Sequence, residues 1–224
     1  MSNTSEQSWN TLVNIEDVPQ VDELYNFVGI LEDMKFVAEA FDQLAELTRE
    51  DGDDEPWVHR QALFSAAVIA YARCFGSGVR GKLEVSALDQ LPQSEPGAAR
   101  KMHKFVCDMR DKHVAHSVSP FEAVMVGGLF HAEEGQTDPS AAVGWLTIRG
   151  LPLGVELALG LRDLARCWVN YLDVQIKLVQ EKVMASLKNE DPEVFAKRPP
   201  IQYTVPSPDD AGIPRRFGRG ISPL

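Results

Sequence analysis

Most of the chain consists of segments with apolar residues at helical spacing, separated by short polar breaks. Residues 21–49 carry apolar side chains at helical spacing, at Val21, Leu24, Phe27, Val28, Leu31, Phe41, Leu44 and Leu47. This spacing places the side chains on one face of a helix. The acidic stretch EDGDDEP (50–56) ends that helix. The same spacing predicts further helices at residues 57–75, 98–116 and 152–188.

A different pattern lies between the last two of these segments. FEAVMVGGLF (121–130) and AVGWLTIRG (142–150) are rich in β-branched and other apolar residues, and the polar stretch HAEEGQTDPSA separates them. This arrangement predicts a β-hairpin with a long loop. From residue 191 onward prolines are frequent, which indicates an irregular tail.

The sequence therefore predicts a mainly α fold. We expect a helical bundle of about four main helices, a small β-hairpin insertion at about 121–150, and an irregular C-terminal tail. Three regions follow from this pattern: an N-terminal extension (1–18), the bundle (19–190) and a Pro-rich basic tail (191–224).

Composition limits the classes of function. The 224 residues are 44% hydrophobic, enough for one core, and carry a net charge of −11. This charge argues against broad, sequence-independent binding to nucleic acid, which depends on many Lys and Arg contacts to phosphates. Residues 197–224 hold five basic and two acidic residues. We expect this basic tail to contact the acidic body or a partner subunit.

Neither a membrane segment nor a secretory signal is predicted. The longest apolar run, residues 62–72, has eleven residues, whereas a membrane span needs about 20. The three cysteines, Cys74, Cys107 and Cys167, are far apart and lack the spacing of zinc ligands. They indicate reduced thiols, and we expect a cytoplasmic protein without a membrane segment.

The stretch MRDKHVAHS (109–117) concentrates the candidate chemistry. An apolar stripe spaced 4, 3, 4, 3 runs through Met102, Val106, Met109, His113 and His116. Both histidines therefore continue the stripe, and Arg110 lies on its flank. The simplest interpretation is two partly buried, hydrogen-bonded histidines and an ion-paired arginine. Two imidazoles without a nearby third ligand do not indicate a metal, so neither a metal nor a cofactor is predicted.

The segment RDKHVAH (110–116) also resembles the Arg-x(4–6)-His signature of HEPN domains, including the abortive-infection branch. Arg110 matches the arginine, Asp111 the polar residue that follows it, and His116 the terminal histidine. The resemblance covers this motif and, in outline, a helical bundle over residues 20–190. It implies an all-helical, usually dimeric domain of a kind that often cuts RNA without a metal.

The resemblance also implies roles for these residues. Arg110 and His116 are about 120° apart on one helix, so two copies facing each other across a two-fold axis would present both pairs to one phosphate. A histidine would move the proton of a ribose hydroxyl, and the guanidinium would stabilise charge on the phosphate. Asp111 would orient the arginine or the partner motif. The family spacing selects His116, whereas His113 is closer to Arg110 in projection, so both remain candidates.

Two functions are compatible with these observations. The first is a dimeric, metal-independent endoribonuclease acting on RNA in stress or phage defence, with an antitoxin or other partner protein. The second is a non-catalytic, HEPN-like dimer that binds a partner or serves as a scaffold. Two shorter patterns, GSG (76–78) and RRFGRG (215–220), are interpreted as a helix stop and a flexible terminus rather than ligand sites.

Overall fold

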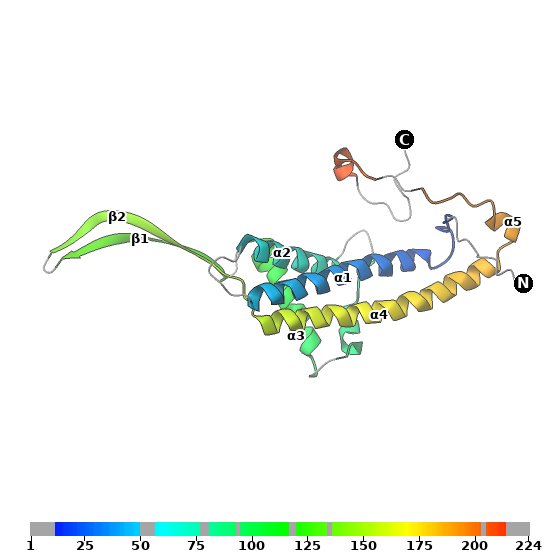
Figure 1. The fold of residues 1–224 in the computed structure, drawn as a ribbon, viewed down its shortest axis with the longest axis horizontal. Coiled ribbons are helices and arrows are strands. Elements are labelled where there is room, and N and C mark those ends of the chain that lie inside the picture. Colours follow the sequence, from blue (N-terminus) through cyan, green and yellow to red (C-terminus); the bar gives the residue numbers. More distant parts are fainter. Residues whose placement is uncertain are drawn as a thin grey trace, which may run out of the picture. The chain divides into compact units, whose positions relative to one another are not determined.

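The computed structural model describes residues 12–49, 57–76, 81–92, 95–116, 120–133, 136–202 and 205–213, with backbone only from 129 to 142. The helices and strands, in chain order, are α1 (Val21–Arg49), α2 (Trp57–Arg73), η1 (Val85–Gln90), α3 (Ala98–Met109), η2 (Arg110–Val114), β1 (Glu122–Glu133), β2 (Gln136–Arg149), α4 (Val155–Lys188), α5 (Pro192–Phe195) and η3 (Pro208–Gly212) (Figure 1). The chain is mainly α-helical with one inserted hairpin, which confirms the predicted fold class.

Contacts within the chain define two compact units. We call residues 33–76 and 83–169 the helical unit, and residues 1–32, 77–82 and 170–224 the terminal unit. Helices α1 and α4 contribute residues to both. The candidate motif and the hairpin both belong to the helical unit.

The core of the helical unit is built from the apolar faces that the sequence pattern predicted. Its largest fully buried side chains include Phe41, Phe64, Tyr71, Leu88 and Trp168, from α1, α2, η1 and α4. Burial of side chains of this size supplies about 1.5–3 kcal/mol each, so this core is the main source of the unit's stability. Helices α3 and α4 pack closely, because a Cβ added at Gly160 would lie 2.8 Å from the Met102 methyl group.

One ion pair ties α2 to α1 beside this core. Arg73, at the end of α2, donates from Nε to Asp33 Oδ2 over 2.8 Å, and its second guanidinium nitrogen contacts Asp33 Oδ1. Asp33 is buried, and its hydrogen bond raises the pKa of Arg73. The apolar setting of Arg73 in the sequence predicts an acidic partner of this kind.

The strands of the hairpin are longer, and its loop is shorter, than predicted. Strands β1 and β2 pair antiparallel from Glu122↔Arg149 to Glu133↔Gln136, with one irregularity between Leu129 and His131. The stretch 131–141, predicted as a long loop, therefore lies almost entirely within the strands, and only residues 134 and 135 separate them. The prediction of a long loop was wrong because it used only the weak intrinsic strand preference of residues 131–141. In the structure, the pairing of the two strands continues from the apolar residues into this polar stretch.

The terminal unit joins segments from both ends of the chain. Val18 and Val21 pack with Val179 and Val183 in a small core. The Asn14 amide donates to the Pro199 carbonyl over 2.8 Å, and the Ile201 amide donates to the Leu12 carbonyl over 2.7 Å. The first part of the tail is thus fixed to the N-terminal segment by backbone hydrogen bonds.

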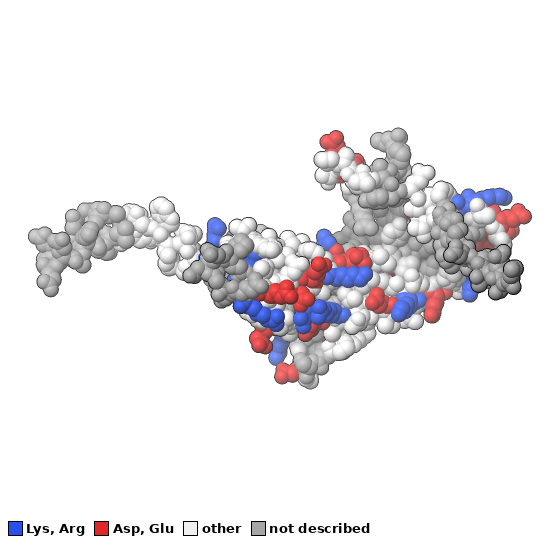
Figure 2. All heavy atoms as spheres, in the orientation of Figure 1, with Lys and Arg blue, Asp and Glu red and all other residues white. Residues whose placement is uncertain are grey.

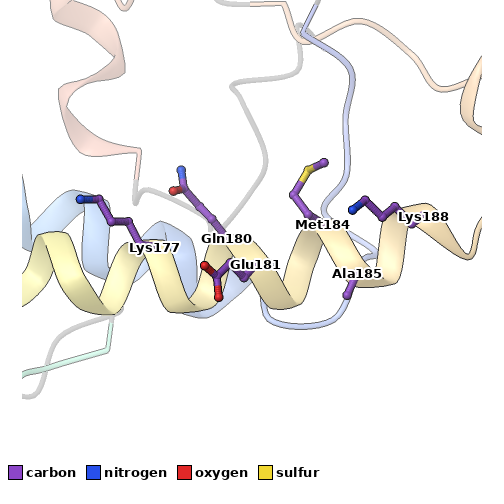
Figure 3. Close-up of a pocket in the computed structure, with 6 residues that line it drawn as sticks. All are labelled: Lys177, Gln180, Glu181, Met184, Ala185 and Lys188. Atoms are coloured by element: carbon purple, nitrogen blue, oxygen red, sulfur yellow. The ribbon is translucent and has the colours of Figure 1, made fainter.

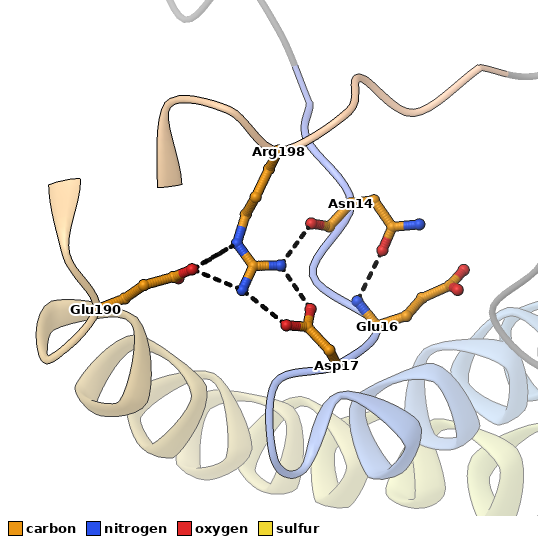
Figure 4. Close-up of polar contacts among 5 residues, drawn as sticks. All are labelled: Asn14, Glu16, Asp17, Glu190 and Arg198. Carbon is orange, nitrogen blue, oxygen red and sulfur yellow. Dashed lines mark hydrogen bonds and ion pairs between the residues drawn. The ribbon is translucent and has the colours of Figure 1, made fainter. Parts of the chain in front are cut away.

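Arg198 reinforces this junction (Figure 4). Its guanidinium donates to both carboxylate oxygens of Asp17, to Glu190 and to the Asn14 carbonyl, at 2.5–3.2 Å. These hydrogen bonds raise the pKa of Arg198 and lower the pKa of Asp17. For this tail residue, the expected contact with acidic groups of the same chain is confirmed. Arg215, Arg216 and Arg219, together with the RRFGRG stretch, lie outside the described residues.

Two further features bear on the sequence predictions. No helix within the described ranges carries an apolar run long enough to cross a bilayer. None of the three cysteines forms a disulfide; Cys74 is buried, and Cys107 and Cys167 are partly buried.

Candidate functional site

The candidate motif lies at the C-terminal end of α3. This helix follows Gly97, which adopts a left-handed conformation (φ 79°) just before the first helical residue. Ala99, Val106 and Met109 are buried on its inner face. Charged side chains occupy the outer face, where Asp108 forms ion pairs with Lys104 and Lys112. The amphipathic pattern of α3 thus directs one face to the core and the other to solvent.

The motif itself is a π-helical turn. The predicted α-helix over 98–116 ends at Met109, and Arg110–Val114 form η2, in which the Ala115 amide donates to the Arg110 carbonyl over 3.0 Å. A hydrogen bond between residues five apart widens the turn and changes the direction of the side chains that follow. Short π-helical turns of this kind are frequent at functional sites.

The two histidines of the motif are in different environments. His113 is buried, with 3% of its surface exposed, and its ring lies edge-on to Phe64 at 6.2 Å and to Phe121 at 6.4 Å. His116 is exposed. The predicted stripe therefore holds as far as His113 but not at His116, because the chain leaves the α-helix before reaching it.

Arg110 and Asp111 are also exposed. The Arg110 guanidinium donates from Nη1 to Asp111 Oδ1 over 2.7 Å, which matches the expected ion pair. An exposed pair of this kind adds little to stability, about 0–1 kcal/mol. Its effect is to orient the guanidinium beside the turn while leaving it open to solvent.

The structure thus divides the four candidate residues into two sets. Arg110, Asp111 and His116 present polar atoms at the surface of a single short segment, whereas the His113 ring packs inside the unit. The first three side chains are therefore accessible from solvent, whereas His113 is not. Among the described residues, no set of three or more His, Cys, Asp or Glu side chains is arranged to hold a metal ion.

A second polar cluster, which the sequence analysis did not identify, lies on the inner side of α3. His103 Nδ1 shares a hydrogen bond of 3.1 Å with the Tyr71 hydroxyl, and His103 Nε2 lies 3.7 Å from the Cys107 sulfur. The ring of Phe75 packs edge-on against His103 at 4.5 Å. The four-residue spacing of His103 and Cys107 was the available signal for a shared helix face.

Burial sets the charge states in this cluster. It lowers the pKa of His103 and raises the pKa values of Cys107 and Tyr71. The imidazole and the thiol are therefore both held in their neutral forms. A reactive cysteine instead needs a thiolate stabilised by a nearby positive charge. We assign these residues to the polar part of the core.

The terminal unit carries an open depression on α4. It has a volume of about 530 Å³ and is lined by Lys177, Gln180, Glu181, Met184, Ala185 and Lys188 (Figure 3). All six side chains come from this one helix, and none belongs to the candidate motif. Binding pockets are usually concave sites with convergent polar groups. A row of side chains along a single helix lacks that convergence, so this depression is a poor candidate for a small-molecule site.

Comparison with family models, with curated proteins and with solved structures found no match to this chain.

Proposed function

We propose that this chain is a metal-independent endoribonuclease of HEPN type, cytoplasmic and active as a homodimer. The observation that supports this proposal best is the division of the motif: Arg110, in the π-helical turn, and His116, two residues after it, are exposed, while His113 anchors that turn in the core. A buried histidine then fixes the position of the segment, and the exposed pair is accessible to substrate. Resemblance to the HEPN signature supplies the reaction type.

In the proposed reaction, His116 removes the proton from a ribose 2′-hydroxyl, whose oxygen attacks the adjacent phosphorus. The bond from phosphorus to the 5′-oxygen breaks, and a histidine, from either copy, returns a proton to that leaving oxygen. Arg110 stabilises the negative charge that develops on the phosphate oxygens. Asp111 holds the guanidinium in place through the 2.7 Å hydrogen bond. Two copies related by a two-fold axis supply the second histidine and arginine.

The test is RNA cleavage by the purified full chain in the presence of a chelator. We expect cleavage products, and we expect Arg110→Ala and His116→Ala each to lower the rate by at least about 100-fold. Arg100→Ala is the matched arginine control, because Arg100 is also exposed and hydrogen-bonded to one aspartate, Asp89. His59→Ala is the matched control for an exposed histidine. Equal rates in wild type and both motif variants would refute the assignment.

The alternative, a non-catalytic dimer that binds a partner protein, is favoured by one observation. Large apolar side chains of the hairpin, among them Val126 and Trp145, are 70% and 76% exposed. Exposed apolar surface of this extent marks interaction sites. Under this alternative no turnover is seen in any variant, and substitutions in the hairpin abolish partner binding.

A further inference from the structure

The hairpin exposes apolar side chains on both of its faces. Cross-strand partners share a face, and successive residues alternate between faces. One face carries the pairs Val124↔Thr147 and Val126↔Trp145, and the other carries Met125↔Leu146 and Ala123↔Ile148. The large apolar residues among these, together with Val143, are between 45% and 76% exposed. In an ordinary antiparallel sheet one face is polar, so this hairpin lacks a solvent face.

The exposed area is sufficient for a stable interface. Seven large side chains contribute to it: Val124, Met125, Val126, Val143, Trp145, Leu146 and Ile148. Together they present on the order of 800 Å² of surface, about the amount that each partner buries in a standard protein–protein interface. An isolated two-stranded hairpin is also only marginally stable in water. Covering this surface would therefore stabilise the strands themselves.

Charge restricts what covers the hairpin. Residues 123–130 and 139–148 contain no Asp, Glu, Lys or Arg, whereas residues 131–138, at the tip, contain three acidic residues. Beyond the charged pair Glu122↔Arg149 at its base, the described part of the hairpin is white in Figure 2, while blue and red side chains are spread over the helices. Inserting the tip into a membrane would bury the three carboxylates, and a nucleic acid would be repelled by them. A protein surface is the remaining class of partner.

A second copy of the chain fits this surface best. Two copies that each carry a net charge of −11 repel each other least where they meet through an uncharged surface, and the middle of the hairpin is uncharged. In a two-fold pair both hairpins are exchanged at once, so each one meets the body of the other copy and its hairpin. That arrangement covers both faces of the hairpin, whereas a single flat partner surface would cover only one.

Two glycines in β1 agree with close approach by another chain. Gly127 and Gly128 do not adopt a positive φ, and a Cβ added to either would meet no atom within 4 Å. Neither the backbone nor the packing of the described chain therefore requires glycine here. Glycine within a strand is typical of a position where a second backbone comes close.

We propose that β1 and β2 form a dimerisation arm that lies on a second copy of this chain. The arm starts next to the candidate motif, because Phe121, one residue before β1, contacts the His113 ring. This inference deepens the homodimer on which the proposed ribonuclease rests. The observations that carry it nevertheless come from the hairpin alone.

The first experiment measures the oligomeric state of the full chain by sedimentation equilibrium. We expect a dimer whose dissociation constant rises about tenfold or more in Val126→Thr/Trp145→Thr, which removes apolar surface but keeps residues that favour strands. Val58→Thr is the matched control, because Val58 is also 76% exposed but lies on α2. A monomeric wild type, or an equal dissociation constant in the double variant, would overturn the inference.

A second readout needs no variant that weakens the fold. Trp145 is 76% exposed in the single chain, so its fluorescence emission should move to longer wavelength when the wild-type dimer is diluted. The shift should be absent in Trp145→Phe, which keeps an aromatic ring at that position. A dilution series without such a shift in the wild type contradicts the arm.

The two proposals fail in different ways. If the hairpin variant dissociates but neither wild type nor variant cuts RNA, the ribonuclease assignment is wrong and the arm stands. If the chain cuts RNA as a dimer that the hairpin variant leaves intact, the arm is wrong and the ribonuclease assignment stands.

Discussion

His113 and His116 are separated by two residues, yet they are in opposite environments. The ring of His113 packs between Phe64 and Phe121, whereas His116 is exposed beyond the π-helical turn. In the sequence both residues continue one apolar stripe, and nothing in their spacing distinguishes them. The difference follows from tertiary contacts: α2 and the residue before β1 supply the aromatic rings that enclose one histidine only.

This difference predicts opposite effects of substituting the two histidines. His113→Ala should lower the free energy of unfolding by about 2–3 kcal/mol, because it leaves a cavity between two aromatic rings. His116→Ala should change it by less than about 0.5 kcal/mol, as is usual for an exposed side chain. Chemical denaturation of the two variants and wild type gives both values. A His113→Ala variant as stable as wild type would show that this ring does not anchor the segment.

At the scale of the elements, the long helices were predictable because each buries one continuous face. Apolar spacing placed α1, α2 and α4 to within a few residues of their observed bounds. The hairpin was predictable from its β-branched runs, and its position at about 121–150 agrees with the observed strands, Glu122–Glu133 and Gln136–Arg149. In each of these elements the spacing of apolar residues along the chain is strong enough to indicate the type of secondary structure.

The π-helical turn and the outer part of the hairpin were not predictable for the same physical reason. Spacing of 4, 3, 4, 3 continues through His116, so an unbroken α-helix satisfies the pattern as well as η2 does. Residues 131–141 have few strand-forming side chains, and their pairing depends on the register set by the inner pairs. Both features are decided by contacts with other segments, which a local pattern does not contain.

Gly97 gives a prediction at this scale, because it sets the start of α3. Its φ of 79° lies in the left-handed region, and a Cβ there would meet no atom within 4 Å. Gly97→Ala should therefore lower the free energy of unfolding by about 1–2 kcal/mol through backbone strain alone. Gly97→Asn should cost less, since asparagine tolerates this conformation better. Thermal unfolding of both variants checks the order, and equal losses for Ala and Asn would argue against backbone strain as the cause.

For the molecule as a whole, charge distribution matters more than composition. The net charge of −11 argues against a broad phosphate-binding surface, but it does not show where individual basic residues lie. Arg198 is an example. The sequence shows it only as one of several basic residues in the tail, whereas in the structure it forms ion pairs with Asp17 and Glu190 where the tail meets the N-terminal segment. Sequence separation hides the contact with Asp17, because this residue and Arg198 are 181 positions apart.

The Arg198 junction predicts a pH-dependent opening of the terminal unit. In Arg198→Ala the amides of Asn14 and Ile201 should exchange with solvent faster, because their hydrogen bonds to Pro199 and Leu12 lose the guanidinium that braces them. Lys197→Ala, at the neighbouring exposed position, should leave their protection factors unchanged.

The hydrogen bond from Arg198 lowers the pKa of Asp17. The stability that this ion pair contributes is therefore complete above the ordinary aspartate value of 3.8 and is lost as the pH falls through the lowered value. Wild-type protection should therefore approach that of Arg198→Ala only in strong acid, and protection factors that are equal in the two proteins at neutral pH would contradict a structural role for the junction.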